Sequence, residues 1–403
     1  MKKVTLNRVI GLPYLILYGL GNIIGAGIYI LIGEISGISG YLTPLAFLTA
    51  CIGVLFSALS YAELSSRYPK SAAEAYFLQK GFNNRLIADI SGFVIILSGL
   101  FSAAAIISGL YGYLQPFVDI GEFATSFVII SILTFIAIWG IKQSVGLAAL
   151  FTLIEILGIL LIIVVGFYYL DLSKIDYSQY IPSKITDINF ILLGSFLAFY
   201  AFIGFEDVVK LSEETINPSK TMPKAIIITL LLVAFLYVAV SFVAVSVVDP
   251  KTLASSKEPL ALVYQELQGD SKILNYIAIF AIVNGALVQI IMVSRMFYGM
   301  AKEGWLPQFL AYVNPTTKTP IYATVLTAIL LSVLVLFLDL VKLAEFTSYG
   351  LLSVFLLINV ALLRIKSKEK APKEAYVVPY WVPAVAIIIN VIFLVVKIMD
   401  NVK

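Results

Sequence analysis

The chain of 403 residues contains no histidine and a single cysteine, Cys51. An intramolecular disulfide is therefore impossible, and a His/Cys metal centre has no ligands. The chain also lacks a G-x-x-x-x-G-K-[ST] phosphate-binding loop, which argues against direct use of ATP. Because its carboxyl groups are isolated, we expect no cofactor, no metal and no enzyme active site.

Charge is scarce as well, since charged residues make up 13% of the chain against about 25% in an average soluble domain. Hydrophobic residues make up 61%, and the mean hydropathy is +1.00. Apolar runs of roughly 20 residues, long enough to cross a lipid bilayer, recur along the whole length. The composition predicts an all-α integral membrane protein of the cell membrane, with Cys51 as a core residue.

We predict eleven transmembrane helices. They cover residues 11–33, 40–65, 86–116, 123–140, 144–170, 188–210, 224–248, 272–301, 320–340, 343–363 and 378–399. The first is too long for a signal peptide and is expected to be retained. Most of the 27 basic residues fall before the first helix or after every second helix, which predicts a cytoplasmic N-terminus and an outside C-terminus. Their spread over short loops does not suggest nucleic-acid binding.

Glycine is concentrated in the first predicted helix, where "GNIIGAGIYI" (residues 21–30) holds three glycines in seven positions. Gly21 and Gly25 form a G-x-x-x-G pair, which by itself favours close packing between helices. The sixth predicted helix changes this interpretation. In "AFYAFIGFEDVVKL", Gly204 is followed by two acidic residues near the middle of the membrane. Acidic side chains are costly there unless they face water or a partner.

These two glycine-containing helices lie five helices apart, and five is an odd number. A five-helix unit that is repeated once must therefore be inverted the second time. Interrupted helices at matching positions of two inverted repeats are typical of secondary transporters. We predict repeats over 11–170 and 188–363, discontinuous first and sixth helices, and one additional helix at 378–399. Free N–H and C=O groups at the breaks would suit a zwitterion such as an amino acid.

Four segments resemble motifs of the amino acid–polyamine–organocation (APC) superfamily of secondary transporters. "GNIIGAGIY" is similar to its first-helix signature, and "FIGFEDVVKLSEETINPSKTMPKAI" to its sixth-helix signature. "SYAELSSRYPKSAAEAYFL" resembles the end of the second helix, with Ser71-Ala72-Ala73-Glu74 where a Ser-Gly-Gly-type run is usual. "SRMFYGMAKEGWLPQFLAYVNPTTKTPIYA" resembles the end of the eighth. The resemblance implies the five-plus-five inverted-repeat fold and amino acid transport.

The resemblance also implies a pocket between helices one, three, six, eight and ten. The substrate carboxylate is expected at the amides of Gly25, Ala26 and Gly27. The ammonium is expected at carbonyl groups around Ile23, Ile24, Phe202 and Ile203. Gly204 completes the predicted substrate-binding set. Tyr200 stands where related exchangers place an aromatic that closes over the substrate, although an ordinary packed aromatic is the alternative.

Glu155, in "LFTLIEILGILLIIVVG", lies about eleven residues into the fifth helix, hence roughly 16 Å deep at 1.5 Å per residue. The resemblance places it where some proton-coupled relatives carry a lysine, in the space of a sodium ion. Burial favours the neutral form of a carboxyl group, so we predict that Glu155 carries the coupling proton, with Asn284 as its neighbour. The alternatives are a protonated glutamate bonded to a helix carbonyl and a carboxylate ligand of sodium.

Glu206 is the second acidic candidate. The resemblance implies a gate on the cytoplasmic side of the substrate, to which Tyr200 also contributes. An i, i+4 ion pair with Lys210 is the alternative for Glu206. Four further charged residues near cytoplasmic helix ends are expected to form a surface network that stabilises one gate state: Glu63, Arg67, Glu213 and Glu214.

The sequence thus predicts alternating-access transport of small to medium neutral amino acids, because apolar residues dominate the expected lining. A cationic amino acid or an amine could use Glu206 or Glu155 as its counter-charge. Exchange, uniport, sodium coupling and a transporter-like amino acid sensor stay open as alternatives. An ion channel would need a continuous polar pore, whereas the polar residues cluster at two helix breaks. The sequence does not indicate an oligomeric state.

Overall fold

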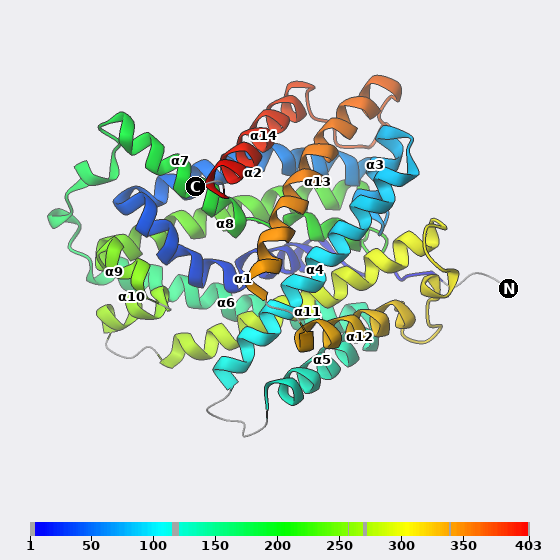
Figure 1. The fold of residues 1–403 in the computed structure, drawn as a ribbon, viewed down its shortest axis with the longest axis horizontal. Helices are drawn as coiled ribbons and strands as arrows, with labels where there is room; N and C mark the ends of the chain where they lie inside the picture. Colours follow the sequence, from blue (N-terminus) through cyan, green and yellow to red (C-terminus); the bar gives the residue numbers. More distant parts are fainter. Residues whose placement is uncertain (1–4, 115–120, 257, 269–271, 338–339, 402–403) are drawn as a thin grey trace.

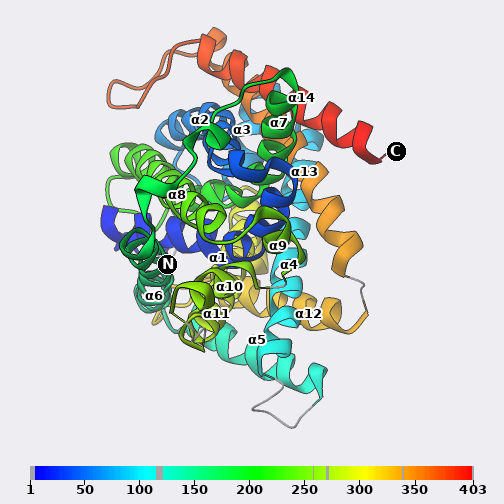
Figure 2. The same ribbon diagram turned by 90° about the vertical axis from the view of Figure 1, so that its left-hand side faces the viewer.

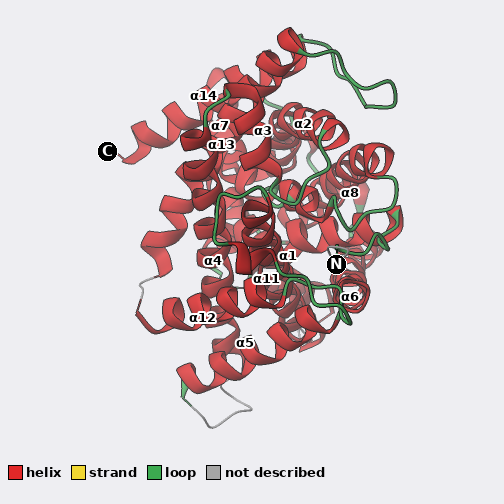
Figure 3. Cartoon of the chain, turned by 90° about the vertical axis from the view of Figure 1, so that its right-hand side faces the viewer, coloured by secondary structure: helices red, strands yellow, loops and turns green. Residues whose placement is uncertain are grey.

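The computed structural model describes residues 5–114, 121–256, 258–268, 272–337 and 340–401, and leaves out the side chains of some residues within these ranges. The described residues form helices and loops, without a strand (Figure 3). The α-helices are α1 (Leu12–Ser39), α2 (Thr43–Arg67), α3 (Ala73–Phe82), α4 (Arg85–Leu114), α5 (Glu122–Trp139), α6 (Ile141–Tyr169), α7 (Ile185–Ala201), α8 (Pro218–Val247), α9 (Pro250–Ser255), α10 (Pro259–Gln268), α11 (Lys272–Lys302), α12 (Ile321–Phe337), α13 (Leu340–Lys368) and α14 (Trp381–Asn401).

Each predicted helix range overlaps a long helix, except that 188–210 is divided between α7 and the 3₁₀-helix η4 (Phe205–Leu211). Three short helices, α3, α9 and α10, lie in segments that the sequence predicted as connections. Eight stretches are long and apolar enough to cross a membrane, and three shorter helices are apolar, judged by length and composition alone. The described residues thus have the helices of a multi-pass membrane protein, while the count of eleven spans and the inverted repeat remain predictions.

Helix α1 lies in the middle of the bundle and packs against α6, α7, α8 and α11, while α5 and α12 form one edge (Figure 2). Gly21 permits this close packing. A Cβ atom at Gly21 would lie 2.0 Å from Thr152 Oγ1 of α6 and 2.4 Å from Asn284 Nδ2 of α11. The close-packing role considered for this glycine is therefore confirmed.

The predicted break in the first helix is not found, because α1 is assigned as one α-helix from Leu12 to Ser39. The burial and surroundings of Gly25, Ala26 and Gly27 lie outside what the structure describes. Glycine lowers helix stability by only about 1 kcal/mol per residue. Backbone N–H and C=O groups left unpaired away from water cost about as much or more. A glycine-rich sequence thus permits unwinding without enforcing it.

The predicted break in the sixth helix is present. Helix α7 ends at Ala201, residues 202–204 form a turn, and η4 begins at Phe205. Gly204 has a φ angle of +122°, a conformation that residues with a Cβ rarely adopt. The backbone therefore changes direction and helix type at the place where the sequence combines glycine with two acidic residues.

The segments predicted to be cytoplasmic gather at one end of the bundle, on the right in Figure 1. Ile10 pairs with Thr215 in an isolated bridge, and Lys70 Nζ lies 2.8 Å from Glu303 Oε1. The short helices α9 and α10, predicted to be outside, lie at the opposite end. The grouping agrees with the predicted alternation of the connections, whereas which end faces the cytoplasm stays a prediction.

Candidate functional site

A cavity of about 330 Å³ opens beside the break between α7 and η4. Its lining comes from α1, α4, α7 with η4, α11 and α13, which correspond to predicted helices one, three, six, eight and ten. Most lining side chains are apolar, and the polar ones include Asn22, Glu206, Asp207 and Gln289. An apolar cavity with a few convergent polar groups is the usual form of a small-molecule site.

The predicted substrate residues divide into three groups. The cavity lining includes five of the predicted binding and gating residues: Ile23, Tyr200, Ile203, Gly204 and Glu206. Ile24 and Phe202 are fully buried and are not part of the lining, and the ring of Phe202 packs 5.2 Å from that of Tyr237. Gly25, Ala26 and Gly27 belong to the continuous helix α1, and their burial and surroundings lie outside what the structure describes.

Tyr237 of α8 is a residue that the sequence did not single out among 23 tyrosines. Its hydroxyl oxygen lies 2.9 Å from the carbonyl oxygen of Ile23 and 3.1 Å from that of Ala201. These carbonyls belong to the region where the substrate ammonium was expected. The Tyr237 hydroxyl thus donates to a backbone carbonyl in the region where the substrate ammonium was expected.

The polar end of the cavity is organised around Asp207. Asn22 Nδ2 donates to Asp207 Oδ2 at 2.7 Å and to the carbonyl of Gly204 at 2.8 Å, so it ties α1 to the break. Gln289 Nε2 of α11 donates to the same carboxylate oxygen at 3.2 Å. The other oxygen, Asp207 Oδ1, lies 2.9 Å from Lys210 Nζ. Asn22 and Gln289 were not predicted from the sequence, although Asn22 lies inside the glycine-rich segment 21–30.

Lys210 does not form the ion pair with the carboxylate of Glu206 that was the alternative to a gating role. Its ammonium instead contacts Glu74 Oε1 at 2.6 Å, Asp207 Oδ1 at 2.9 Å and the carbonyl of Glu206 at 3.3 Å. The reason is the 3₁₀ conformation of η4: three residues per turn stack position i on i+3, so Asp207 takes the place that an α-helix would give to Glu206. The Glu206 carboxylate accepts the N–H of Gly204 at 2.8 Å.

Glu155 is fully buried in α6, and its predicted neighbour is in contact with it. Asn284 Nδ2 of α11 donates to Glu155 Oε1 at 2.7 Å and lies 3.0 Å from Thr152 Oγ1. Glu155 Oε2 has no hydrogen-bond partner among the described residues. The side chain is therefore bonded to another side chain and not to a helix carbonyl, and one oxygen remains free to hold a proton.

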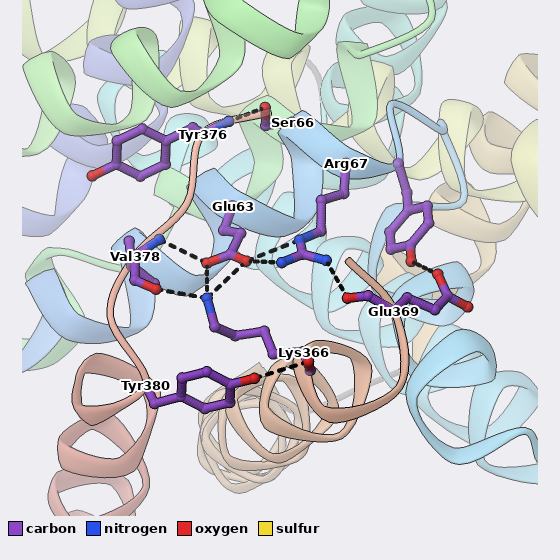
Figure 4. Close-up of polar contacts among 9 residues, drawn as sticks. Glu63, Ser66, Arg67, Lys366, Glu369, Tyr376, Val378 and Tyr380 are labelled. Atoms are coloured by element: carbon purple, nitrogen blue, oxygen red, sulfur yellow. Dashed lines mark hydrogen bonds and ion pairs between the residues drawn. The ribbon is translucent and has the colours of Figure 1, made fainter. Parts of the chain in front are cut away.

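The charged residues expected in a surface network are largely buried. Glu63 is fully buried and accepts hydrogen bonds from the Arg67 guanidinium, from Lys366 Nζ at 2.8 and 3.0 Å, and from the N–H of Val378 at 2.8 Å (Figure 4). Residues 369–380 connect α13 to α14 and include Val378. In the same segment, the carbonyl of Glu369 accepts a hydrogen bond from Arg67 Nη1 at 3.4 Å. This connection therefore lies against the end of α2 and helps to bury Glu63 and Arg67.

Glu214 and Arg295 form a second buried pair at 3.1 Å, with both side chains fully enclosed. Glu213 contacts Lys302 nearer to the surface. The four residues do form ion pairs near helix ends, as expected. The expectation that these ion pairs lie on the surface was wrong. The sequence shows a charge at a helix end, but it does not show which distant segment covers that end.

Comparison with known proteins gives a consistent picture. A family model described as amino acid permease matches residues 10–403. The branched-chain amino acid permease BcaP of Bacillus subtilis (strain 168) is 30% identical, over 93% of this chain and 84% of its own. The mitochondrial cationic amino acid transporter 3 of Arabidopsis thaliana is 31% identical, over 90% of this chain but 63% of its own. The methylthioribose transporter of Bacillus subtilis (strain 168) is 28% identical, over 96% of this chain and 87% of its own.

The chain thus spans less than two thirds of the plant relative and most of the two bacterial ones. All three are named as permeases or transporters and not as enzymes. The family model covers nearly the whole chain, including the residues that line the cavity and the break between α7 and η4. The apolar helices, the cavity and the family match agree, and the chain belongs to the amino acid permease family of the APC superfamily, as a multi-pass membrane transporter.

Proposed function

We propose that the protein moves small to medium neutral amino acids across the cell membrane by alternating access. The observation that carries this proposal is the cavity beside the interrupted helix, where apolar side chains of α4 and α11 face a polar end at Asn22 and Gln289. The apolar part suits an uncharged side chain, and the polar end suits the ammonium and carboxylate of a zwitterion. The cationic substrates named for the plant relative make a cationic amino acid the second candidate.

The arrangement of ion pairs supports a closed cytoplasmic side. Arg295 follows Gln289 by six residues on α11, or about 9 Å along the helix, and Lys302 by thirteen, or about 20 Å. Arg295 pairs with Glu214 and Lys302 pairs with Glu213, and both glutamates lie in the segment that follows η4. Successive ion pairs therefore lie between the cavity and the end of the bundle that is predicted to be cytoplasmic. We infer that these pairs must separate when the cavity opens to that side.

The experiment that tests transport is counterflow. Purified protein in liposomes preloaded with an unlabelled neutral amino acid is expected to accumulate the labelled form transiently. A sensor with the same pocket would bind the amino acid without moving it, and a channel would give no transient excess. Absence of counterflow for all twenty amino acids, from protein that keeps its thermal stability, would contradict the proposal.

Proton coupling through Glu155 gives a separate prediction. A proton gradient is expected to drive accumulation in liposomes without sodium, because the free Oε2 of this buried carboxyl can hold the proton. Glu155→Gln is expected to lower gradient-driven accumulation at least about tenfold, while counterflow continues, since the amide keeps a bond to Asn284 but cannot titrate. Uptake is measured with labelled substrate.

Glu122→Gln is the matched control, because this glutamate is exposed at the start of α5. It is expected to leave gradient-driven uptake unchanged. Uptake that requires sodium, or a Glu155→Gln variant that still accumulates substrate on a proton gradient, would overturn the coupling role.

A further inference from the structure

The cavity is lined in part by acidic residues, which the transport of neutral amino acids does not by itself explain. Two acidic residues, Glu206 and Asp207, are part of its lining, and no lysine or arginine is among the described lining residues. A cation is nonetheless close by. The ammonium of Lys210 lies 2.9 Å from Asp207, on the carboxylate oxygen opposite the one that Asn22 and Gln289 hold.

Lys210 is held in this position from several sides. Its side chain is completely buried, and its three contacts, with Glu74, Asp207 and the carbonyl of Glu206, can take all three protons of the ammonium. Glu74 comes from α3, which the sequence predicted as a loop. The ammonium is therefore held in a fixed position beside Asp207 and is not a mobile surface charge.

Asp207 has its hydrogen-bonding capacity largely filled by the chain. One oxygen faces Lys210, and the other accepts from two side-chain amides. A substrate cation that approached Asp207 would compete with an ammonium that is already in contact. Like charges brought together in a site of low dielectric repel each other strongly.

We propose that Lys210 is a specificity-determining residue, a built-in counter-ion of Asp207 that makes the cavity select amino acids with uncharged side chains. This inference rests on the proposed function and deepens it. Glu206 can pair with the α-ammonium that every amino acid carries. Asp207 cannot pair with a second cation, on the substrate side chain, because Lys210 already neutralises it. The specificity thus comes from a residue that does not line the cavity.

Loss of the Lys210 charge has a defined consequence. Asp207 and Glu74 would both become buried carboxylates without their counter-ion, which is costly unless a new cation replaces it. Of the two, only Asp207 is among the described lining residues of the cavity. The cavity leads to this carboxylate, and a lysine or arginine side chain could supply the cation. Gln289 Oε1, which has no hydrogen-bond partner among the described residues, would accept a further hydrogen bond from that group.

The test is a binding comparison on the purified, full-length protein, with leucine and lysine as ligands. The measured quantity is the ratio of the two dissociation constants. Lys210→Met is expected to shift this ratio toward lysine at least about tenfold, or 1.4 kcal/mol. The double variant Lys210→Met with Asp207→Asn removes the Lys210–Asp207 ion pair and is expected to restore the preference for leucine, because the remaining partner Glu74 is not among the described lining residues.

Lys220→Met is the control, because Lys220 is exposed and pairs with exposed Glu374. It should keep the wild-type ratio. A Lys210→Met variant that binds leucine with an unchanged ratio would overturn the inference. If Lys210→Met does not fold, the double variant decides: its preference for leucine supports charge cancellation, and tighter binding of lysine refutes it. Wild-type protein that binds neither ligand, nor any other amino acid, would instead refute the proposed function.

Discussion

Glu63→Ala is expected to destabilise the protein by about 3–5 kcal/mol, the usual cost of removing one partner from a buried ion pair. The change would leave two cations, Arg67 and Lys366, without their shared carboxylate. Their side chains are only 3% and 4% exposed, so water cannot replace the lost contacts. The N–H of Val378 would lose its acceptor as well. The effect is measured as the free energy of unfolding in detergent micelles.

The matched control is Glu374→Ala, in the connection between α13 and α14 that also contains Val378. Glu374 is 75% exposed and pairs with Lys220, which is 63% exposed, so its removal should change stability by no more than about 0.5 kcal/mol. Equal stabilities of the two variants would mean that Glu63 does not hold the α13–α14 connection against α2. A decrease confined to Glu63→Ala would show that this connection is an integral part of the bundle.

The positions of the long helices could be predicted because apolar length is a local property of the sequence. Helices α3, α9 and α10 were missed for the same reason. Each has only six to ten residues and includes polar side chains. Helices this short have little stability of their own and form because the rest of the protein packs against them. Glu74 shows the consequence, because its contact with Lys210 depends on a helix that the sequence did not predict.

The candidate site was predictable in outline but not in its contacts. The break at Gly204 followed from glycine next to acidic residues, and Asn284 was correctly placed beside Glu155. The partners of Asp207 could not be found in this way, since Asn22 lies 185 residues away and Gln289 82 residues away. The alternative that paired Lys210 with Glu206 was wrong because the pairing depends on helix type. A 3₁₀ turn and an α turn differ by one residue in register, which is enough to exchange two adjacent acids.

The central role of the break gives the second large effect. Gly204→Ala is expected to reduce amino acid binding and counterflow at least about tenfold, which corresponds to 1.4 kcal/mol. A φ angle of +122° strains any residue with a Cβ, and such strain costs about 1–3 kcal/mol. The new Cβ atom would also lie 2.7 Å from Asn22 Nδ2 and 3.1 Å from the carbonyl oxygen of Asn22.

Displacement of Asn22 is the reason that binding should fall together with stability. Its amide joins α1 to Gly204 and Asp207, so a shift would disturb the polar end of the cavity. Gly146→Ala in α6 is the control, because the position is helical and, apart from the neighbouring backbone of α6 itself, no described atom lies within 4 Å of the added Cβ. It should keep full counterflow and gain slight stability. If Gly204→Ala matched this control in binding, counterflow and melting temperature, the interrupted backbone between α7 and η4 could not be the basis of substrate recognition.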